Sequence, residues 1–233
     1  MVPVLSFDSK GNKLNKNQTP EIMKTLLTII ALTSSTLIGY SQDNKSNNRI
    51  EPPAPITQSK FSIGLKGGFG HSFMIPYQNY IFCPSWDAGV SAIYAPGKHW
   101  GLGVDALYSM EGAKFEYMNA ETGARSDVQA TLDYIRIPVK AIYFFRDYSK
   151  DFRPKVTLGP SLGILVAEVN SRNAASIDLG GKFTAGFNYR IAKAIWINVD
   201  ASYYQGFMDI YSNNSANDLN GNVRLDAGVN FGF

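Results

Sequence analysis

The chain has 233 residues, a small net charge of +3 and a single cysteine, Cys83. The charged fraction of 18% is low and the aromatic fraction of 13% is high, whereas soluble domains usually carry about 25% charged residues. Basic residues form no run or helical stripe, so we expect no nucleic-acid partner. One cysteine excludes an intrachain disulfide, and the length allows one domain or two small ones.

Residues 23–41 predict a secretory signal peptide. The segment starts Met-Lys, and its apolar stretch from Leu26 to Ile38 is interrupted by Thr and Ser. Gly39 and Ser41 then occupy the −3 and −1 positions of a cleavage site. The stretch is too short and too polar for a bilayer-spanning helix, and no cysteine follows it that could carry a lipoprotein anchor.

Two polar segments flank the signal peptide. Residues 1–22 look unrelated to export, so we expect them to be a non-native upstream extension and Met23 to be the true start. Residues 42–59 are rich in Asn, Pro and Ser and predict a flexible periplasmic linker.

From residue 60 to residue 233 apolar residues recur at every second position, which is the period of a strand. The pattern predicts eight strands, over 61–69, 86–94, 100–110 (extending as far as 117), 134–145, 156–166, 182–190, 195–204 and 222–233. Long polar loops are expected at 70–85, 118–133, 167–181 and 205–222, and shorter turns at 95–99, 146–155 and 191–194. Long loops on one side and short turns on the other are typical of outer-membrane barrels. The expected fold is therefore all-β: an eight-stranded antiparallel up-and-down transmembrane β-barrel.

Alternation alone does not say whether the apolar face points inward or outward. A soluble carrier of a small apolar ligand would place it inside. The apolar face carries no charge, however, and the polar face combines charges with many glycines, which suits the crowded interior of a narrow barrel. Aromatic residues also gather near the strand ends, as in the two girdles of a membrane barrel. The predicted girdle comprises Phe61, Trp86, Tyr94, Trp100, Tyr108, Tyr143, Tyr189 and Tyr203. We therefore expect an apolar face that contacts outer-membrane lipid.

The opposite face of the strands carries charges of both signs. The predicted lumen charge network comprises Lys66, Asp87, Asp105, Arg136, Lys140, Lys155, Lys182, Arg190, Asp200, Arg224 and Asp226, and Glu111 lies on the same face. An eight-stranded barrel has room only for its own side chains, and buried charges need partners. We expect paired charges that fill the lumen; an ion path is the alternative.

The last predicted strand, 222–233, is expected to close the barrel against the first. Its final Phe233, together with Phe231, resembles the terminal aromatic of outer-membrane barrels. That resemblance implies an assembly signal that the barrel-assembly machinery recognises.

Several segments resemble a Bacteroidota outer-membrane family, often called porin family or PorT-like. The matching pieces are LDYIRIPVKAIYFF (132–145), LGPSLGIL (158–165), ASYYQGFMDI (201–210) and the last strand. Arg136 stands where the family usually has an acid. Pro138 and Pro160, which the matching pieces share, are expected at bulges because each removes a ladder donor.

Catalysis is not expected. His71 and His99, the two histidines, have no spacing that suggests a triad or a metal site, and no cofactor is predicted. The expected function is that of a non-enzymatic barrel with a structural, envelope-interaction or accessory role through its surface loops. The resemblance adds the alternative of an accessory component of the type IX secretion system, and envelope or secretion-complex proteins are the expected partners.

Overall fold

The computed structural model describes residues 60–76, 80–118, 123, 125–171, 173–211 and 218–232. All of them belong to one compact unit, residues 55–233. The predicted upstream extension, start at Met23, signal peptide and periplasmic linker lie outside the described residues, as does Phe233. No helix among the described residues is long and apolar enough to cross a membrane.

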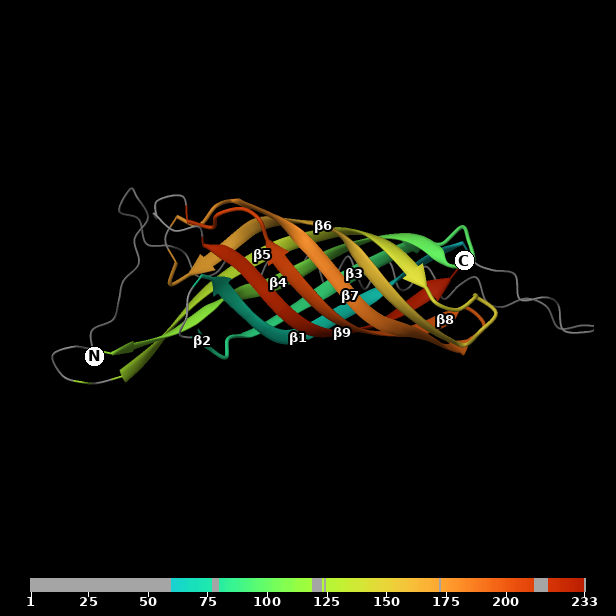
Figure 1. Cartoon of the computed structure of the whole chain (residues 1–233), viewed down its shortest axis with the longest axis horizontal. Helices are drawn as coiled ribbons and strands as arrows, with labels where there is room; N and C mark the ends of the chain where they lie inside the picture. The colour runs from blue at the N-terminus through green and yellow to red at the C-terminus, as the bar shows by residue number, and fades with distance from the viewer. Residues whose placement is uncertain are drawn as a thin grey trace, which may run out of the picture. The chain divides into compact units, whose positions relative to one another are not determined.

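The described chain is a closed ring of long antiparallel strands (Figure 1). The strands are β1 (Phe61–Ile75), β2 (Tyr80–Ile81), β3 (Pro84–Tyr94), β4 (Trp100–Met118), β5 (Arg125–Phe144), β6 (Phe152–Val169), β7 (Ile177–Ala192), β8 (Ile195–Gly206) and β9 (Leu219–Gly232). They pair in the order β4-β3-β1-β9-β8-β7-β6-β5, and β5 returns to β4. The two-residue β2 pairs only with the far part of β4. The eight-stranded up-and-down barrel predicted from the sequence is thus confirmed.

The seam between β1 and β9 closes the barrel. Its register runs without interruption from Ser62 opposite Gly232 to Ile75 opposite Leu219. A Cβ atom at Gly64 would overlap the Val229 carbonyl oxygen of β9, so this position requires glycine for the two backbones to approach. Closure leaves no strand edge in lipid, where unpaired backbone groups would be costly.

The strands extend further at the long-loop end than the alternation predicts. The largest difference is between β4 and β5, where most of the expected loop 118–133 is a β-hairpin. Cross-strand ion pairs Lys114–Asp127 (2.7 Å) and Arg125–Glu116 (3.2 Å) hold this hairpin together. Both of its faces carry polar residues, so the apolar period that marks the other strands is missing. The expected loops 70–85, 167–181 and 205–222 are shortened in the same way, by residues of β1, β3, β6, β7, β8 and β9.

The expectation that Pro138 and Pro160 mark bulges is wrong. The offset between β5 and β6 is the same on both sides of Pro138, which lies opposite Ser161. The register of β6 and β7 is also continuous at Pro160. The irregularity between β5 and β6 lies instead between Asp133 and Tyr134. A missing N–H removes one ladder bond, and it does not require an extra residue.

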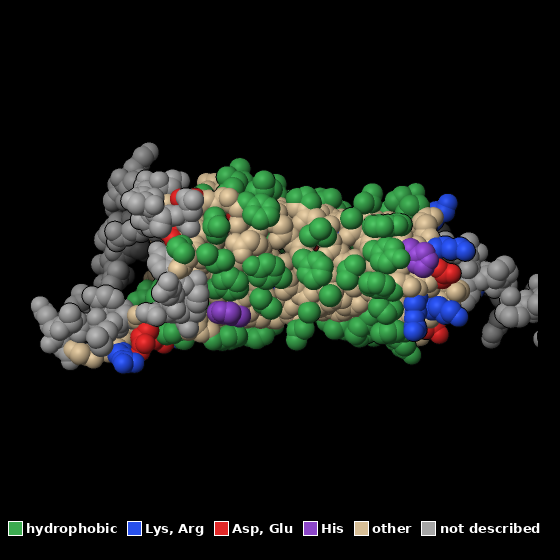
Figure 2. Space-filling view, in the orientation of Figure 1, with side chains coloured by type: hydrophobic (Ala, Val, Ile, Leu, Met, Phe, Trp, Pro, Cys, Tyr) green, Lys and Arg blue, Asp and Glu red, His purple; other side chains and the backbone are tan. Residues whose placement is uncertain are grey.

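The apolar face of the strands points outward. Leu225, in the interior of β9, is 68% exposed, and Leu158 in β6 is 65% exposed. Figure 2 shows hydrophobic side chains in a band along the barrel wall, with Lys, Arg, Asp and Glu gathered at its two ends. The soluble carrier with an apolar lumen is therefore wrong, because a soluble protein rarely exposes so large an apolar surface.

Replacing Val199 with arginine tests this outward face. Val199 lies near the middle of β8, opposite Phe187 of β7 and Ala227 of β9. Val199→Arg should lower the free energy of unfolding in lipid vesicles by about 2–4 kcal/mol, the cost of a cation near the bilayer midplane. The matched control is Ile191→Arg at the short-turn end of β7, which should cost about 0–1 kcal/mol. Equal losses in the two urea titrations would contradict the depth assignment.

Candidate functional site: the charged lumen

The polar face of the strands encloses the lumen. Among the predicted network residues, the buried ones are Lys66, Asp87, Asp105, Arg136, Lys155, Lys182, Arg190, Asp200, Arg224 and Asp226. The side chain of Lys140 is 11% exposed. Glu111 and Asp178 are buried among them.

The centre of the lumen is organised around Lys66 of β1. Its Nζ atom lies 3.2 Å from Asp226 of β9, 3.4 Å from Asp200 of β8 and 4.0 Å from Asp105 of β4. One lysine thus joins carboxylates from three strands. The cavity lined by Lys66 and Asp105 has a volume of about 0 Å³, so each of these charges depends on the others for compensation.

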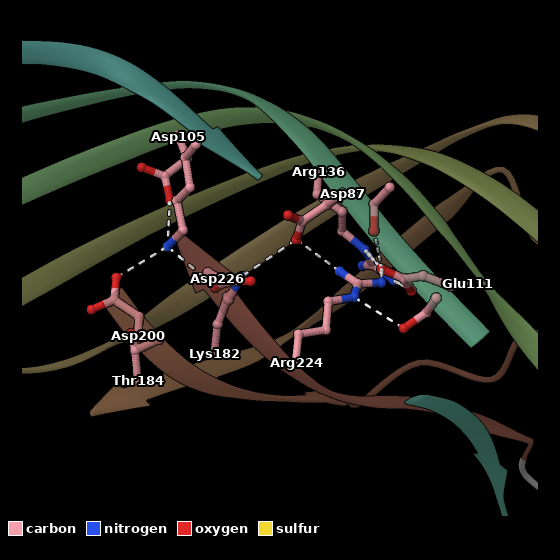
Figure 3. A network of polar contacts seen from close by, with 12 residues as sticks. Asp87, Asp105, Glu111, Arg136, Lys182, Thr184, Asp200, Arg224 and Asp226 are labelled. Atoms are coloured by element: carbon pink, nitrogen blue, oxygen red, sulfur yellow. Dashed lines mark hydrogen bonds and ion pairs between the residues drawn. The ribbon is translucent and has the colours of Figure 1, made fainter. Parts of the chain in front are cut away.

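Three further lysines complete this central layer. Lys140 of β5 lies 2.6 Å from Asp105, and Lys155 of β6 lies 3.0 Å from Asp200. Lys182 of β7 lies 3.6 Å from Asp226 and 3.9 Å from Asp87 of β3. Lys182 therefore connects the central layer to a second layer nearer the loops (Figure 3).

The second layer is built on Glu111 of β4. Arg136 of β5 donates two hydrogen bonds to this carboxylate, at 2.5 and 3.0 Å. Ser109, Asn220 and Arg224 donate three more, at 2.7, 2.5 and 3.3 Å respectively. A buried carboxylate with this many donors is fully compensated and holds one geometry.

Arg136 is also held on its remaining sides. Its guanidinium donates to Asp178 of β7 at 2.6 Å, and it lies 4.4 and 4.2 Å from the ring centroids of Tyr134 and Tyr204. The Tyr204 hydroxyl donates to Asp178 at 2.9 Å. The sequence prediction missed Asp178 because it fell in an expected loop. Its apolar neighbours Ile177 and Leu179 indicate the direction of Asp178, because alternation places them on the lipid-facing side and Asp178 on the lumen side.

These two layers balance in charge. Together, six cations meet six carboxylates: Lys66, Lys140, Lys155, Lys182, Arg136 and Arg224 with Asp87, Asp105, Asp200, Asp226, Glu111 and Asp178. Asp87 lies between the layers, 2.9 Å from Arg224 and 3.9 Å from Lys182. Cavities between the side chains have volumes of about 0, 10 and 30 Å³, where a single water needs roughly 10–15 Å³. These cavities offer no diffusion path for solutes.

A third layer lies at the short-turn end, where no carboxylate of the described residues forms an ion pair with Arg153. The Arg153 guanidinium lies 3.9 Å from the Phe144 ring centroid and donates to the carbonyls of Arg146 and Lys98. Arg190, a predicted member of the lumen network, also lies here and not with the central carboxylates. It lies 4.5 Å from the Trp196 ring centroid and pairs with Asp151 at 3.7 Å.

The predicted girdle residues occupy two levels of the outer face. Towards the short-turn end, Phe61 lies opposite Tyr94, and Trp100 lies opposite Tyr143 with ring centroids 5.0 Å apart. Tyr189, opposite Phe152, is at the same level. Towards the loop end lie Trp86, Tyr108 and Tyr203, with the Trp86 and Tyr108 centroids 5.5 Å apart. Phe231 of β9 is exposed at the short-turn level.

The two histidines lie at opposite ends of the barrel. The Nδ1 atom of His71 accepts the Cys83 backbone N–H at 3.1 Å. His99 contacts the Phe144 carbonyl through Nδ1 at 2.8 Å and Asp147 through Nε2 at 3.2 Å. No group of three or more His, Cys, Asp or Glu side chains in the described residues could hold a metal ion.

Comparison with known proteins identifies a family. The family model described as "Outer membrane protein beta-barrel domain" matches residues 40–212. No curated protein matches the chain.

Solved structures of several outer-membrane barrels are similar to the chain. OprG from Pseudomonas aeruginosa is 13% identical over 74% of this chain and 95% of its own, with a TM-score of 0.47. Neisserial surface protein A is 19% identical over 75% and 98%, with a TM-score of 0.47. Outer membrane protein W of E. coli is 16% identical over 73% and 97%, with a TM-score of 0.38.

Removal of the Glu111 carboxylate tests the second layer. Glu111→Ala leaves the guanidinium groups of Arg136 and Arg224 short of their main acceptor in a dry interior. We expect the free energy of unfolding in vesicles to fall by about 3–5 kcal/mol. Glu116→Ala is the matched control on the same strand: it breaks the exposed pair with Arg125 and should cost at most about 1 kcal/mol. Similar urea midpoints for the two variants would argue against a tightly compensated lumen.

Proposed function

Because the chain belongs to the outer membrane protein beta-barrel domain family, we propose that it is a non-enzymatic barrel whose role depends on its outer surfaces and loops. The barrel lies in the outer membrane. The observation that carries the proposal is the lumen, where the cavities lined by the two charge-balanced layers have volumes of about 0 and 10 Å³. Such an interior stabilises the barrel and offers no binding chamber for a metabolite.

The loop end adds support because apolar side chains meet inside the barrel there. Met74, Leu132, Tyr134 and Ile210 form a buried cluster with Ala113. The segment after β8 supplies Ile210, whose backbone N–H donates to the Asp218 carbonyl and whose carbonyl accepts from Ala175. A buried apolar cluster at this end suits a surface that contacts other envelope components better than a water-filled pore entrance.

Catalysis has little support in this geometry. His99 is engaged by a carbonyl and a carboxylate at the turn end, and His71 is engaged by backbone at the other end. The buried carboxylates pair with lysine and arginine side chains, and the cavities that Asp87, Asp105 and Glu111 line have volumes of about 0 and 10 Å³. A scaffold or interaction role in the envelope is therefore the function that we propose.

A lipid-bilayer recording tests the filled lumen. Purified, folded monomer should give either no conductance or rare, small, flickering events, because the ion-paired side chains occupy the space that solutes would need. The control is detergent alone, added at the same dilution. Large, steady, ohmic openings from the folded monomer would overturn the proposal.

An accessory role in type IX secretion is the second candidate. Its support is the resemblance of residues 132–145 to the PorT-like pieces, a segment that covers β5 from Leu132 to its end at Phe144. Arg136, which replaces the usual acid, is the residue that joins Glu111 and Asp178 in the lumen. Because Arg136 is buried in the lumen, this difference from the family pattern lies inside the barrel and not on its outer surfaces.

Assembly partners form a related proposal. Phe231, exposed at the end of closing strand β9, and Phe233 would be recognised by the barrel-assembly machinery. Affinity purification from crosslinked outer membranes separates the possibilities. Recovery of secretion components with the mature barrel would support the accessory role. Loss of crosslinks to the assembly machinery in Phe231→Ala, with precursor export intact, would support the assembly role; unchanged insertion would count against it.

A further inference from the structure

The short-turn end of the barrel carries an incomplete ring of exposed cations, which we call the basic rim. Its members are Lys60, Lys98, Arg146, Lys150 and Lys193. They come from the residue before β1 and from the β3–β4, β5–β6 and β7–β8 turns, so they are distributed around the end of the barrel. Figure 2 shows Lys and Arg side chains gathered at this end, beyond the apolar band.

The cations of the basic rim outnumber the acids in the described turns at this end, which are Asp147 and Asp151. Asp147 lies 3.2 Å from His99 Nε2, and Asp151 lies 3.7 Å from the buried Arg190. Among the described residues, no carboxylate forms an ion pair with a side chain of the basic rim. The rim therefore presents positive charge to its surroundings.

The depth of the basic rim is set by its neighbours in the chain. Each cation lies within two residues of an exposed apolar side chain on the lipid-facing wall. The pairs are Lys60 with Phe61, Lys98 with Trp100, Arg146 with Phe145, Lys150 with Phe152 and Lys193 with Ile191. Aromatic side chains of this kind lie at the level of the lipid headgroups, so the cations beside them lie at the level of the phosphates.

We propose that the basic rim binds the phosphate headgroups of anionic phospholipids in the leaflet that surrounds the short-turn end. A cation at an anionic membrane surface raises affinity by roughly fivefold at low salt. Five cations around the circumference match a shell of individual lipids better than one macromolecular partner, which would bind to one side. The proposal concerns the wall and turns and does not depend on the role proposed for the loop end.

Quenching of Trp100 by brominated lipids measures this preference directly. Of the three tryptophans in the chain, Trp196 is buried in the lumen and Trp86 is removed by Trp86→Phe, which leaves Trp100 facing lipid beside Lys98. Two sets of vesicles contain the same mixture of phosphatidylglycerol and phosphatidylcholine, with bromine on only one of the two lipids. Both leaflets have the same composition, so the orientation of the inserted barrel does not matter.

The quenching by each brominated lipid gives the fraction of phosphatidylglycerol next to Trp100. At low salt we expect this local fraction to exceed the bulk fraction by about threefold or more. The enrichment should fall towards the bulk value in roughly 1 M salt, where the Debye length is about 3 Å. It should also disappear in the variant K60Q/K98Q/R146Q/K150Q/K193Q. The control K114Q/R125Q removes cations from the loop-end hairpin and should leave it unchanged.

Two results would overturn the proposal. One is a local phosphatidylglycerol fraction next to Trp100 that equals the bulk fraction at low salt in the protein with its native basic rim. This measurement needs no rim variant, so it does not depend on whether that variant folds. The other is enrichment that survives in the folded rim variant, since the lipid preference would then come from elsewhere on the wall.

Discussion

Closure of eight strands into a narrow barrel is the constraint on which the rest of this structure depends. A ring of this size has an interior wide enough only for side chains, and its outer face must remain apolar in lipid. Polar residues on every strand are therefore forced into a space without bulk water. Lys66 shows the consequence: its ammonium group is shared by aspartates from β4, β8 and β9. Ion pairs thus connect strands across the lumen at this level, in addition to the backbone ladder between neighbouring strands.

The three layers of the lumen solve the same problem with different chemistry. Lysines and aspartates suit the centre, where one ammonium can serve several carboxylates. Nearer the loops the planar guanidinium of Arg136 fits Glu111 in a bidentate pair and stacks between two tyrosine rings. At the short-turn end Arg153 uses carbonyls and the Phe144 ring in place of an acid, since π-faces and carbonyl oxygens also stabilise a cation.

The sequence allowed the fold to be predicted because membrane barrels impose a simple rule on each strand. Ile195, Ile197 and Val199 alternate with inward residues, and the same alternation located the seam strand β9 and the inward charges. It failed where the rule stops applying, beyond the membrane. The hairpin between β4 and β5 has polar groups on both faces, so alternation does not reveal its strands. Asp178 is a different case: Ile177 and Leu179 do alternate with it, but this short stretch precedes Gly180 and Gly181 and falls in the expected loop 167–181.

Membership of the network was harder to predict than the inward direction of a side chain. Arg190 alternates as an inward residue, yet its height along the barrel takes it away from the central carboxylates and towards Asp151 and Trp196. The position of a residue along the barrel axis depends on strand tilt and on the stagger between neighbouring strands. The alternation of polar and apolar residues within one strand carries no information on either. For Pro138, too, the sequence alone misled, since it predicted a bulge. The register of β5 is the same before and after Pro138 because the neighbouring strands β4 and β6 fix β5 on both sides.

The two ends of the barrel treat exposed charge differently. On the loop-end hairpin, Glu116 and Asp127 pair across the strands with Arg125 and Lys114. At the short-turn end, Asp151 lies 3.7 Å from the buried Arg190 while its own side chain stays 68% exposed. Arg153, buried at the same end, takes its acceptors from the backbone carbonyls of Arg146 and Lys98. The turns that carry the basic rim therefore also supply the acceptors for the cations that closure buries beneath them.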